Sequence, residues 1–169
     1  HMVIVTGHIT KTKKRRYMEA LIRKAESQDN ESITSIAITC WKDAYKDIFP
    51  KDLLDNLSLE DRLKQRLSWF NLPNRYSIVA MIQNTIIGFC DYGESRRPQF
   101  SPGEIYSLYV LPEYKGHGIG KTLSLKAMRH LQEVNLTPFI VTTLEVNFPA
   151  RKFYEKLGFE VTGQIITEV

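Results

Sequence analysis

Residues 104–128 read EIYSLYVLPEYKGHGIGKTLSLKAM, and this stretch decides the fold. Its first seven residues are β-branched, aromatic or leucine except for Glu104 and Ser107, which predicts a strand with both faces largely covered. Pro112 ends this strand, because a proline cannot continue the hydrogen-bond ladder. Beyond the glycines, apolar residues recur at helical spacing, which predicts a long amphipathic helix. These apolar residues are Ile119, Leu123, Ala127, Met128, Leu131 and Val134.

Three glycines, Gly116, Gly118 and Gly120, form the turn between that strand and that helix. They allow positive φ angles and a close approach of the backbone to a ligand. The N–H groups at the start of the helix point outward, where the helix dipole favours an anion. The turn matches neither the six-residue dinucleotide pattern nor the Gly-Lys-Ser/Thr ending of a nucleotide-triphosphate loop. This stretch alone therefore favours phosphate binding but leaves a simple turn open.

Length and composition predict a single soluble domain. The 169 residues are enough for one sizeable core, and no apolar run approaches the length that spans a bilayer. The only two cysteines, Cys40 and Cys90, each lie inside an apolar segment, so we expect no disulfide framework and a cytoplasmic location. Both are interpreted as small buried apolar residues. We expect no metal site, because His117 is a lone histidine within the turn and faces solvent.

The net charge of +4 belongs to the N-terminus rather than to the fold. Residues 1–24 hold seven of the 23 Lys and Arg residues but only one of the 19 acids, which leaves 16 basic and 18 acidic residues elsewhere. Such a basic segment is usually a solvated extension, and only sometimes an arm that binds an anion. We therefore expect residues 1–20 to form a basic extension that is flexible or partly derived from a tag. Residues 21–169 are expected to form one domain, without nucleic-acid binding.

The remaining elements predict an α/β fold in which helices cover a mixed sheet. Polar residues before Ile33 and at Ser58 predict two helix starts, and Asn84-Thr85 predicts a tight hairpin turn. Gly158 is placed to end a short helix. The expected strands are 21–25, 76–83, 86–92, 104–110, 138–146 and 159 onward, and the expected helices lie at 33–41, 58–70, 119–134 and 150–157.

Residues 147–159, which read NFPARKFYEKLGF, carry a second motif. The sequence resembles the GCN5-related N-acetyltransferase (GNAT) superfamily over roughly residues 21–168. The signature Asn-x-x-Ala-x-x-Phe-Tyr-Glu-Lys-x-Gly-Phe is matched at every fixed position. The earlier signature, Leu-x-Val-x-Pro followed by Arg/Gln-x-x-Gly-x-Gly/Ala, is matched except that Lys115 replaces Arg or Gln. Two motifs in the right order make the resemblance specific.

The resemblance implies a GNAT-type acyl-CoA N-acyltransferase fold. Its sheet is mixed, mostly antiparallel and flanked by helices, and its two central strands splay around the cofactor. By this resemblance, the backbone at 116–121 would hold the CoA pyrophosphate. The strand at 108–110 and Asn147 would both bond the pantetheine arm of CoA, and Tyr154 would lie beside its sulfur. The residues implied in cofactor binding are Leu108, Tyr109, Val110, Lys115, Gly116, His117, Gly118, Ile119, Gly120, Lys121, Asn147 and Tyr154.

Acetylation of an amine by a thioester needs a base, an oxyanion donor and an acid. An alkylamine titrates near 10.4, so roughly one molecule in a thousand is the free base at neutral pH. The resemblance implies the N–H near Val110 as oxyanion donor and Tyr154 as acid, against a tyrosine that only packs. Glu104 is the candidate base, placed by alternation on the face of Tyr106, Leu108 and Val110. An ordinary charged residue at a strand mouth is equally open.

Several other residues have a second interpretation. Glu145 is a weaker candidate base, and more simply a solvent-facing strand residue. Tyr106 and Tyr109 are expected on opposite faces, so that at most one faces the acceptor. Trp41, Tyr45 and Phe49 have the spacing of a helical core stripe, with an acceptor pocket as the alternative. His130 is expected on the polar face of the long helix.

The sequence thus predicts a direct transfer of acetyl from acetyl-CoA to a primary amine. The acceptor is a small molecule (a polyamine, an amino acid or an aminoglycoside-like compound) or a protein or peptide amine. The alternative is a non-catalytic acyl-CoA sensor with the same fold. Members of the superfamily commonly add a last strand beside the cofactor cleft, for which residues 164–169 leave little length. A neighbouring chain would then supply that strand, so a homodimer is expected.

Overall fold

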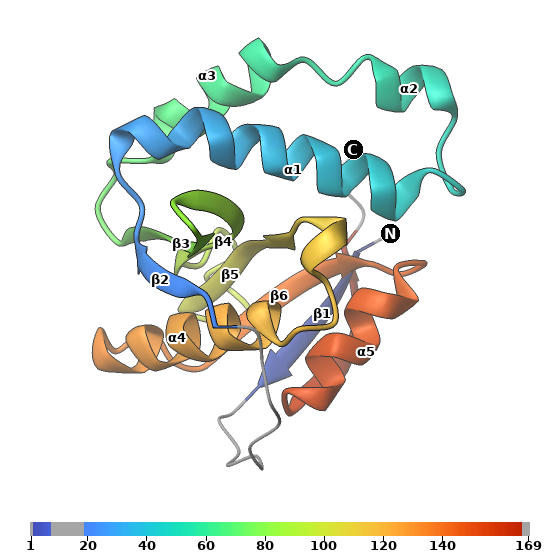
Figure 1. Ribbon diagram of the computed structural model, residues 1–169. Helices are drawn as coiled ribbons and strands as arrows, with labels where there is room; N and C mark the ends of the chain where they lie inside the picture. Colours follow the sequence, from blue (N-terminus) through green and yellow to red (C-terminus); the bar gives the residue numbers. More distant parts are fainter. Residues whose placement is uncertain (1, 8–18, 167–169) are drawn as a thin grey trace.

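The computed structural model describes residues 2–7 and 19–166, which form one seven-stranded mixed sheet with helices on both faces (Figure 1). The strand order is β2-β3-β4-β5-β6-β1-β7, and every neighbouring pair is antiparallel except β5 and β6. The strands are β1 (Met2–Gly7), β2 (Leu21–Lys24), β3 (Arg75–Ile82), β4 (Thr85–Glu94), β5 (Gly103–Val110), β6 (Phe139–Leu144) and β7 (Phe159–Ile166). The predicted α/β class and the predicted hairpin are both confirmed, although the two turn residues are Gln83 and Asn84 rather than Asn84 and Thr85.

Two groups of helices cover the two faces of this sheet. One face carries α1 (Asn30–Tyr45), α2 (Lys51–Asp55) and α3 (Leu59–Trp69), and the other carries α4 (Ile119–Glu133) and α5 (Phe148–Lys156) (Figure 1). Short 3₁₀ turns lie at Ser27–Asp29 and Pro112–Tyr114. The Ser58 hydroxyl accepts a hydrogen bond from Asp61 N and caps α3, as its capping-box pattern predicts. The helix faces that meet the sheet are apolar, which is the usual reason for such layering.

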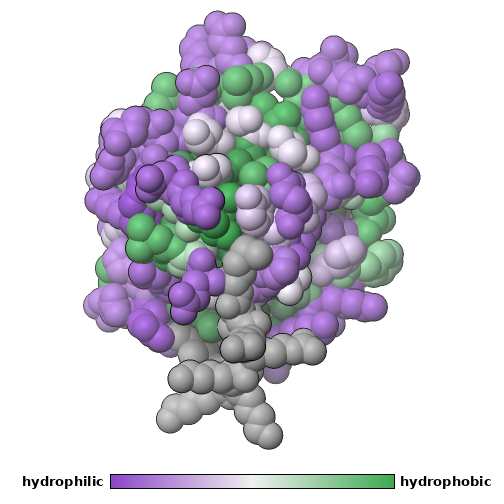
Figure 2. Space-filling model, in the orientation of Figure 1, coloured by the Kyte–Doolittle hydropathy of each residue, from purple (hydrophilic) through white to green (hydrophobic). Residues whose placement is uncertain are grey.

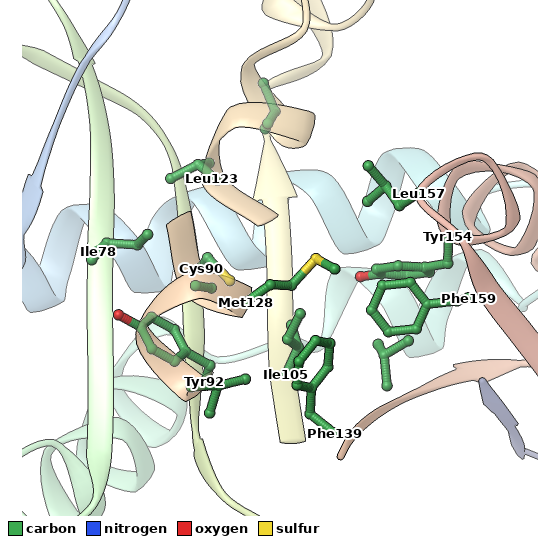
Figure 3. Close-up of a cluster of buried hydrophobic side chains, with 14 of the residues drawn as sticks. Ile78, Cys90, Tyr92, Ile105, Leu123, Met128, Phe139, Tyr154, Leu157 and Phe159 are labelled. Atoms are coloured by element: carbon green, nitrogen blue, oxygen red, sulfur yellow. The ribbon is translucent and has the colours of Figure 1, made fainter. Parts of the chain in front are cut away.

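Two apolar clusters result, one under each layer of helices. The larger lies between the sheet and α4 and α5, and Figure 3 shows Met128, Tyr154 and Phe159 within it. The smaller lies under α1 and includes Ile33, Cys40 and Phe89. Both cysteines are buried, as expected. Hydrophilic side chains cover most of the face seen in Figure 2, and no described helix is long and apolar enough to cross a membrane.

The strands β5 and β6 pair only at one end. Their parallel register joins Gly103–Ile105 to Phe139–Val141 and goes no further, although β5 continues to Val110 and β6 to Leu144. The two strands therefore separate after Ile105. This is the central splay that the resemblance implied.

The expectation for the N-terminal extension is wrong at Met2–Gly7. These residues form β1, which lies between β6 and β7 and pairs antiparallel with both. Ile4 and Val5 are fully buried there, so this short apolar run gains its stability from the two neighbouring strands. The sheet position for which a neighbouring chain was expected is filled by the same chain, which removes the reason for expecting a homodimer. Residues 8–18, which hold five of the seven basic residues of the segment 1–24, lie outside the described residues.

A bulge in β5 overturns the expected facing of its side chains. Asp91 pairs with Ser107 and Tyr92 pairs with Ile105, so Tyr106 is the extra residue. A bulge shifts the alternation of the strand by one residue. Ile105, Leu108 and Val110 consequently pack in the cluster under α4, so Glu104 does not share the face of Leu108 and Val110.

The same bulge brings Tyr106 and Tyr109 onto one face, against the expectation. The Tyr106 ring lies 6.2 Å from the ring of Trp69 on α3, and the Tyr109 ring lies 5.7 Å from that of Phe89 in the cluster under α1. His130 also differs from expectation. Its Nδ1 lies 2.9 Å from the Tyr92 hydroxyl, so it contacts the sheet instead of lying on a polar face.

Candidate active site

The glycine turn has the backbone shape that anion binding requires. Gly116 and Gly118 both have φ of +81°, and Gly118 is the N-cap of α4. A Cβ at Gly116 would meet nothing within 4 Å, so the turn is open to a ligand. The first turn of α4 contains no acidic residue, and its N–H groups at Ile119, Gly120 and Lys121 have no acceptor within the helix. His117 is exposed, as predicted. These residues fit a pyrophosphate.

The edge of β5 that faces the splay offers backbone donors. Leu111 N donates to Ile87 O at 2.8 Å, which fixes which residues of β5 point toward β4. Because the N–H groups of a strand alternate between its two edges, those of Leu108 and Val110 point away from β4, toward the gap to β6. The strand segment predicted to bond the pantetheine arm therefore has donors aimed into that gap. The side chain of Tyr109 lies on the face of the sheet that α1 covers.

Helix α5 places Asn147 and Tyr154 beside the same gap. Asn147 Oδ1 accepts a hydrogen bond from Ala150 N at 3.2 Å and so caps α5, while its Nδ2 donates to the Tyr45 hydroxyl at 3.0 Å. A Cβ at Gly120 would lie 3.6 Å from the ring of Phe153, so α5 also adjoins the glycine turn. The structure thus brings the two sequence motifs together.

The Tyr154 hydroxyl is suited to remain protonated. Its side chain is 6% exposed and packs against the rings of Phe153 and Phe159 at 5.1 and 5.4 Å. Burial raises the pKa of Tyr154 far above the usual tyrosine value, because the phenolate would lose its hydration. Within the part of the chain that the structure describes, no hydrogen bond to this hydroxyl is found. The hydroxyl is therefore a proton donor with its donor capacity unused.

Helix α1 lies across the mouth of the splay and touches all of these elements. The Cys40 thiol donates to Val110 O at 3.3 Å, Asp43 Oδ2 lies 3.2 Å from Lys115 Nζ, and Tyr45 binds Asn147 as described above. The Lys115 hydrogen bond holds the pKa of Asp43 below its usual value. The rings of Trp41, Tyr45 and Phe49 lie with centroids 4.5–5.5 Å apart, and those of Trp41 and Phe49 are stacked, so they form an aromatic cluster at the C-terminal end of α1 and just beyond it. The Asp43–Lys115 pair was missed because 72 residues separate its members.

Glu104 lies apart from these groups, and both of its carboxylate oxygens already accept hydrogen bonds. Its side chain is 0% exposed. One carboxylate oxygen accepts from the Arg96 guanidinium at 2.6 Å and from Arg97 at 3.1 Å, and the other accepts from Arg96 N at 2.8 Å. Six residues of strand, about 20 Å, separate it from Val110. The other candidate base, Glu145, is exposed and lies just after the end of β6.

A cavity of about 460 Å³ opens on the opposite face of the sheet, under α1 and α3. Tyr106 and Ser107, the first residues of β5 beyond its pairing with β6, form part of its wall. Arg66 of α3 lies there, buried, with its Nη1 2.6 Å from Asp91 Oδ2, its Nη2 2.9 Å from Ser77 Oγ and its Nε 2.7 Å from Asn30 Oδ1. Sequence reasoning missed this cavity. Its one signal was a lone carboxylate, Asp91, inside the otherwise apolar strand β4.

No cluster of three or more His, Cys, Asp or Glu side chains that could hold a metal ion occurs among residues 2–7 and 19–166. Burial raises the pKa of the Cys40 thiol to about 11 and that of Cys90 well above its usual value. A thiol with a raised pKa forms little thiolate at neutral pH, which argues against either cysteine as a nucleophile.

Comparison with known proteins agrees with this geometry. A model of the acetyltransferase (GNAT) family matches residues 30–159. The chain is 27% identical over 160 residues to the uncharacterized N-acetyltransferase YuaI of Bacillus subtilis, covering 88% of this chain and 89% of that protein. It is 28% identical over 150 residues to a spermidine N(1)-acetyltransferase of Thermoplasma acidophilum, covering 85% and 90% respectively.

Among solved structures, the PaiA N-acetyltransferase of Thermoplasma acidophilum in complex with coenzyme A superimposes with a TM-score of 0.73 at 27% identity. The superposition covers 88% of this chain and 94% of that one. The chain belongs to the acetyltransferase (GNAT) family, and its assignment as an acetyl-CoA-dependent N-acetyltransferase is confirmed.

Proposed function

We propose that this protein transfers the acetyl group of acetyl-CoA directly to a primary amine of a small molecule or of a protein or peptide. The observation that carries the proposal is the splay of β5 from β6 next to the open glycine turn. The turn and Lys115 would hold the pyrophosphate. The N–H of Leu108 and the side chain of Asn147 would hold the pantetheine arm. Acetyl-CoA, when bound, supplies an activated acyl group as its thioester.

The N–H of Val110 is the proposed donor for the negative charge that develops on the reacting carbonyl. It belongs to the β5 edge that faces the splay, so it is held in place by the sheet before any ligand arrives. A donor fixed in advance costs no reorganisation during the reaction. Removal of one such donor typically costs about 10²–10³ in rate.

Tyr154 is the proposed acid for the leaving thiolate. Its raised pKa keeps the hydroxyl protonated across the range in which the amine becomes deprotonated. A rise in pH from 7 to 10 should therefore increase the concentration of free amine without removing the acid. We expect the rate to rise over that range, with no fall at the usual pKa of tyrosine.

The reaction also needs a base that takes the proton of the amine. Glu104 has been named as its candidate, but both of its oxygens accept hydrogen bonds from Arg96 and its neighbours. The carboxylate is also fully buried and about 20 Å of strand away from Val110, so it does not reach an amine at the splay. We therefore propose that water takes the amine proton and that Glu104 positions Arg96.

The buried, unpaired cysteines also support direct transfer and a cytoplasmic location.

The test is thiol release from acetyl-CoA with a panel of amines, using Tyr154→Phe and the matched control Tyr76→Phe. Tyr76 lies on β3, in contact with His130 and away from the splay. We expect Tyr154→Phe to lower kcat by about 10²–10⁴, as for loss of a general acid, and Tyr76→Phe to lower it less than threefold or so. CoA binding measured by calorimetry should be the same in all three proteins. Tight CoA binding with no thiol release on any amine would instead favour the acyl-CoA sensor.

A further inference from the structure

The cavity under α1 and α3 is the natural position for the acceptor. It has the size of a small-molecule site, and it lies on the face of the sheet opposite the glycine turn. Its wall includes Tyr106 and Ser107 of the splayed segment of β5, and Val110 is only three residues, about 10 Å, further along that strand. An acceptor seated there would reach the reacting carbonyl through the splay.

The charge of this cavity is strongly positive. Four arginines line it, Arg62, Arg66, Arg75 and Arg96, against one carboxylate, that of Asp91. Two of the four are neutralised, because Arg66 pairs with Asp91 at 2.6 Å and Arg96 pairs with Glu104 at 2.6 Å.

Arg62 and Arg75 have no carboxylate partner among the residues that the structure describes. Arg62 is exposed on α3 at the rim. Arg75 donates to the Glu94 carbonyl at 2.8 Å and to the Tyr106 hydroxyl, both of them neutral acceptors, and its guanidinium lies 4.9 Å from the centre of the Tyr106 ring. The cavity therefore offers two uncompensated guanidinium charges.

The cavity also holds its cations in place. Arg96 lies over the same Tyr106 ring at 5.1 Å and is tied to buried Glu104, so Tyr106 is flanked by two guanidiniums. Trp69 extends the wall and lies 5.0 Å from the Arg66 guanidinium. Arginines stacked on aromatic rings keep their N–H donors oriented, which favours two-point binding of a planar or tetrahedral anion.

We propose that the acceptor is a small amine that also carries an anionic group, a carboxylate or a phosphate, which Arg62 and Arg75 bind. This inference rests on the proposed function and narrows its substrate class. An amino acid or an aminophosphate fits the charge and size of the cavity. A polyamine or an aminoglycoside would place two or more further cations beside uncompensated guanidiniums and would be repelled.

The test compares amines that differ only in the anion. Lysine is paired with 1,5-diaminopentane, which lacks its carboxylate, and phosphoethanolamine is paired with ethanolamine. We expect kcat/KM to be about tenfold or more higher for at least one anionic member than for its partner, and that pair identifies the anion. The ratio should fall toward one in Arg62→Gln and Arg75→Gln. The control Lys64→Gln removes an exposed charge of α3 that does not line the cavity, and it should keep the ratio.

A binding measurement separates this inference from the proposed function. Trp69 lines the cavity, so its fluorescence in a Trp41→Phe background reports occupancy without any acetyl transfer. We expect lysine or phosphoethanolamine to change this signal at a concentration at least about tenfold lower than its partner that lacks the anion, and Arg75→Gln to abolish the difference. Equal responses, or preference for 1,5-diaminopentane, would overturn the inference even if transfer occurs. Anion-selective binding with no transfer would overturn the proposed function alone. Arginine stays charged throughout, so the preference should persist from pH 6 to 10.

Discussion

The two faces of the sheet offer different chemical groups to a ligand. The face under α4 and α5 offers mainly backbone: positive-φ glycines, the first N–H groups of a helix and the free edge of β5. The face under α1 and α3 offers side chains, with four arginines gathered from α3, β3 and the segment after β4. A backbone site needs particular residues at fixed spacing, so it leaves a motif. A side-chain site can be assembled from distant residues, so it leaves none.

Of the variants that test this difference between the two faces, Asp91→Ala is expected to have the largest effect, a loss in the free energy of unfolding. It leaves the Arg66 guanidinium buried with only neutral partners, which should cost about 3–5 kcal/mol in the free energy of unfolding. Urea denaturation measures this loss. The double variant Arg66→Met with Asp91→Leu, which removes both charges, should recover most of it. A loss below about 1 kcal/mol for Asp91→Ala would show that the buried pair does not support the side-chain face.

Glu104→Gln tests whether that carboxylate is a base or a support for the arginines. We expect the free energy of unfolding to fall by about 1.5–3 kcal/mol, because charge-assisted hydrogen bonds to Arg96 and Arg97 are weakened. The pH profile of kcat should keep its shape. A kcat that falls a hundredfold at neutral pH and recovers as pH rises would instead identify Glu104 as the base.

Gly118→Val tests the backbone face. Valine at a φ of +81° costs about 2 kcal/mol, which corresponds to about a 30-fold loss of CoA affinity if the turn must deform. Gly163→Val is the matched control, since Gly163 also has positive φ, with nothing within 4 Å of its Cβ, but lies on β7 away from the turn. Calorimetry should find CoA affinity unchanged in the control. Equal losses in both variants would mean that the effect is general destabilisation.

Lys115→Ala should have the smallest effect. Its pair with Asp43 is partly exposed, so we expect at most about 1 kcal/mol of stability, and a few-fold loss of CoA affinity from the missing charge. Lys115 lowers the pKa of Asp43 in the folded protein. The pair therefore contributes to the free energy of unfolding above about pH 4, and this contribution is lost as the pH falls through the pKa of Asp43. Thermal unfolding at pH 7 and pH 3 measures this. A difference between variant and wild type that is larger at pH 3 would contradict it.

The sequence predicted the fold wherever local patterns sufficed. The strand, turn and helix at 104–128 and the α5 motif were placed correctly because apolar periodicity, glycines and caps act within a few residues. It failed at Met2–Gly7, whose four apolar residues are a strand only because β6 and β7 lie on either side. It also failed at the bulge, since one extra residue at Tyr106 reverses the facing of the residues before the bulge relative to those after it.

The sequence by itself determined the cofactor side of this protein. The glycines, Asn147 and Tyr154 follow from two motifs, and the backbone conformations that those residues allow are properties of the residues themselves. Only the tertiary structure decided the proposed acceptor side. It paired Arg66 with Asp91 across 25 residues, buried Glu104 under Arg96, and left Arg62 and Arg75 at one cavity without a carboxylate partner among residues 2–7 and 19–166. Charge balance is a sum over neighbours in space, and only the packed sheet and helices decide which side chains are neighbours.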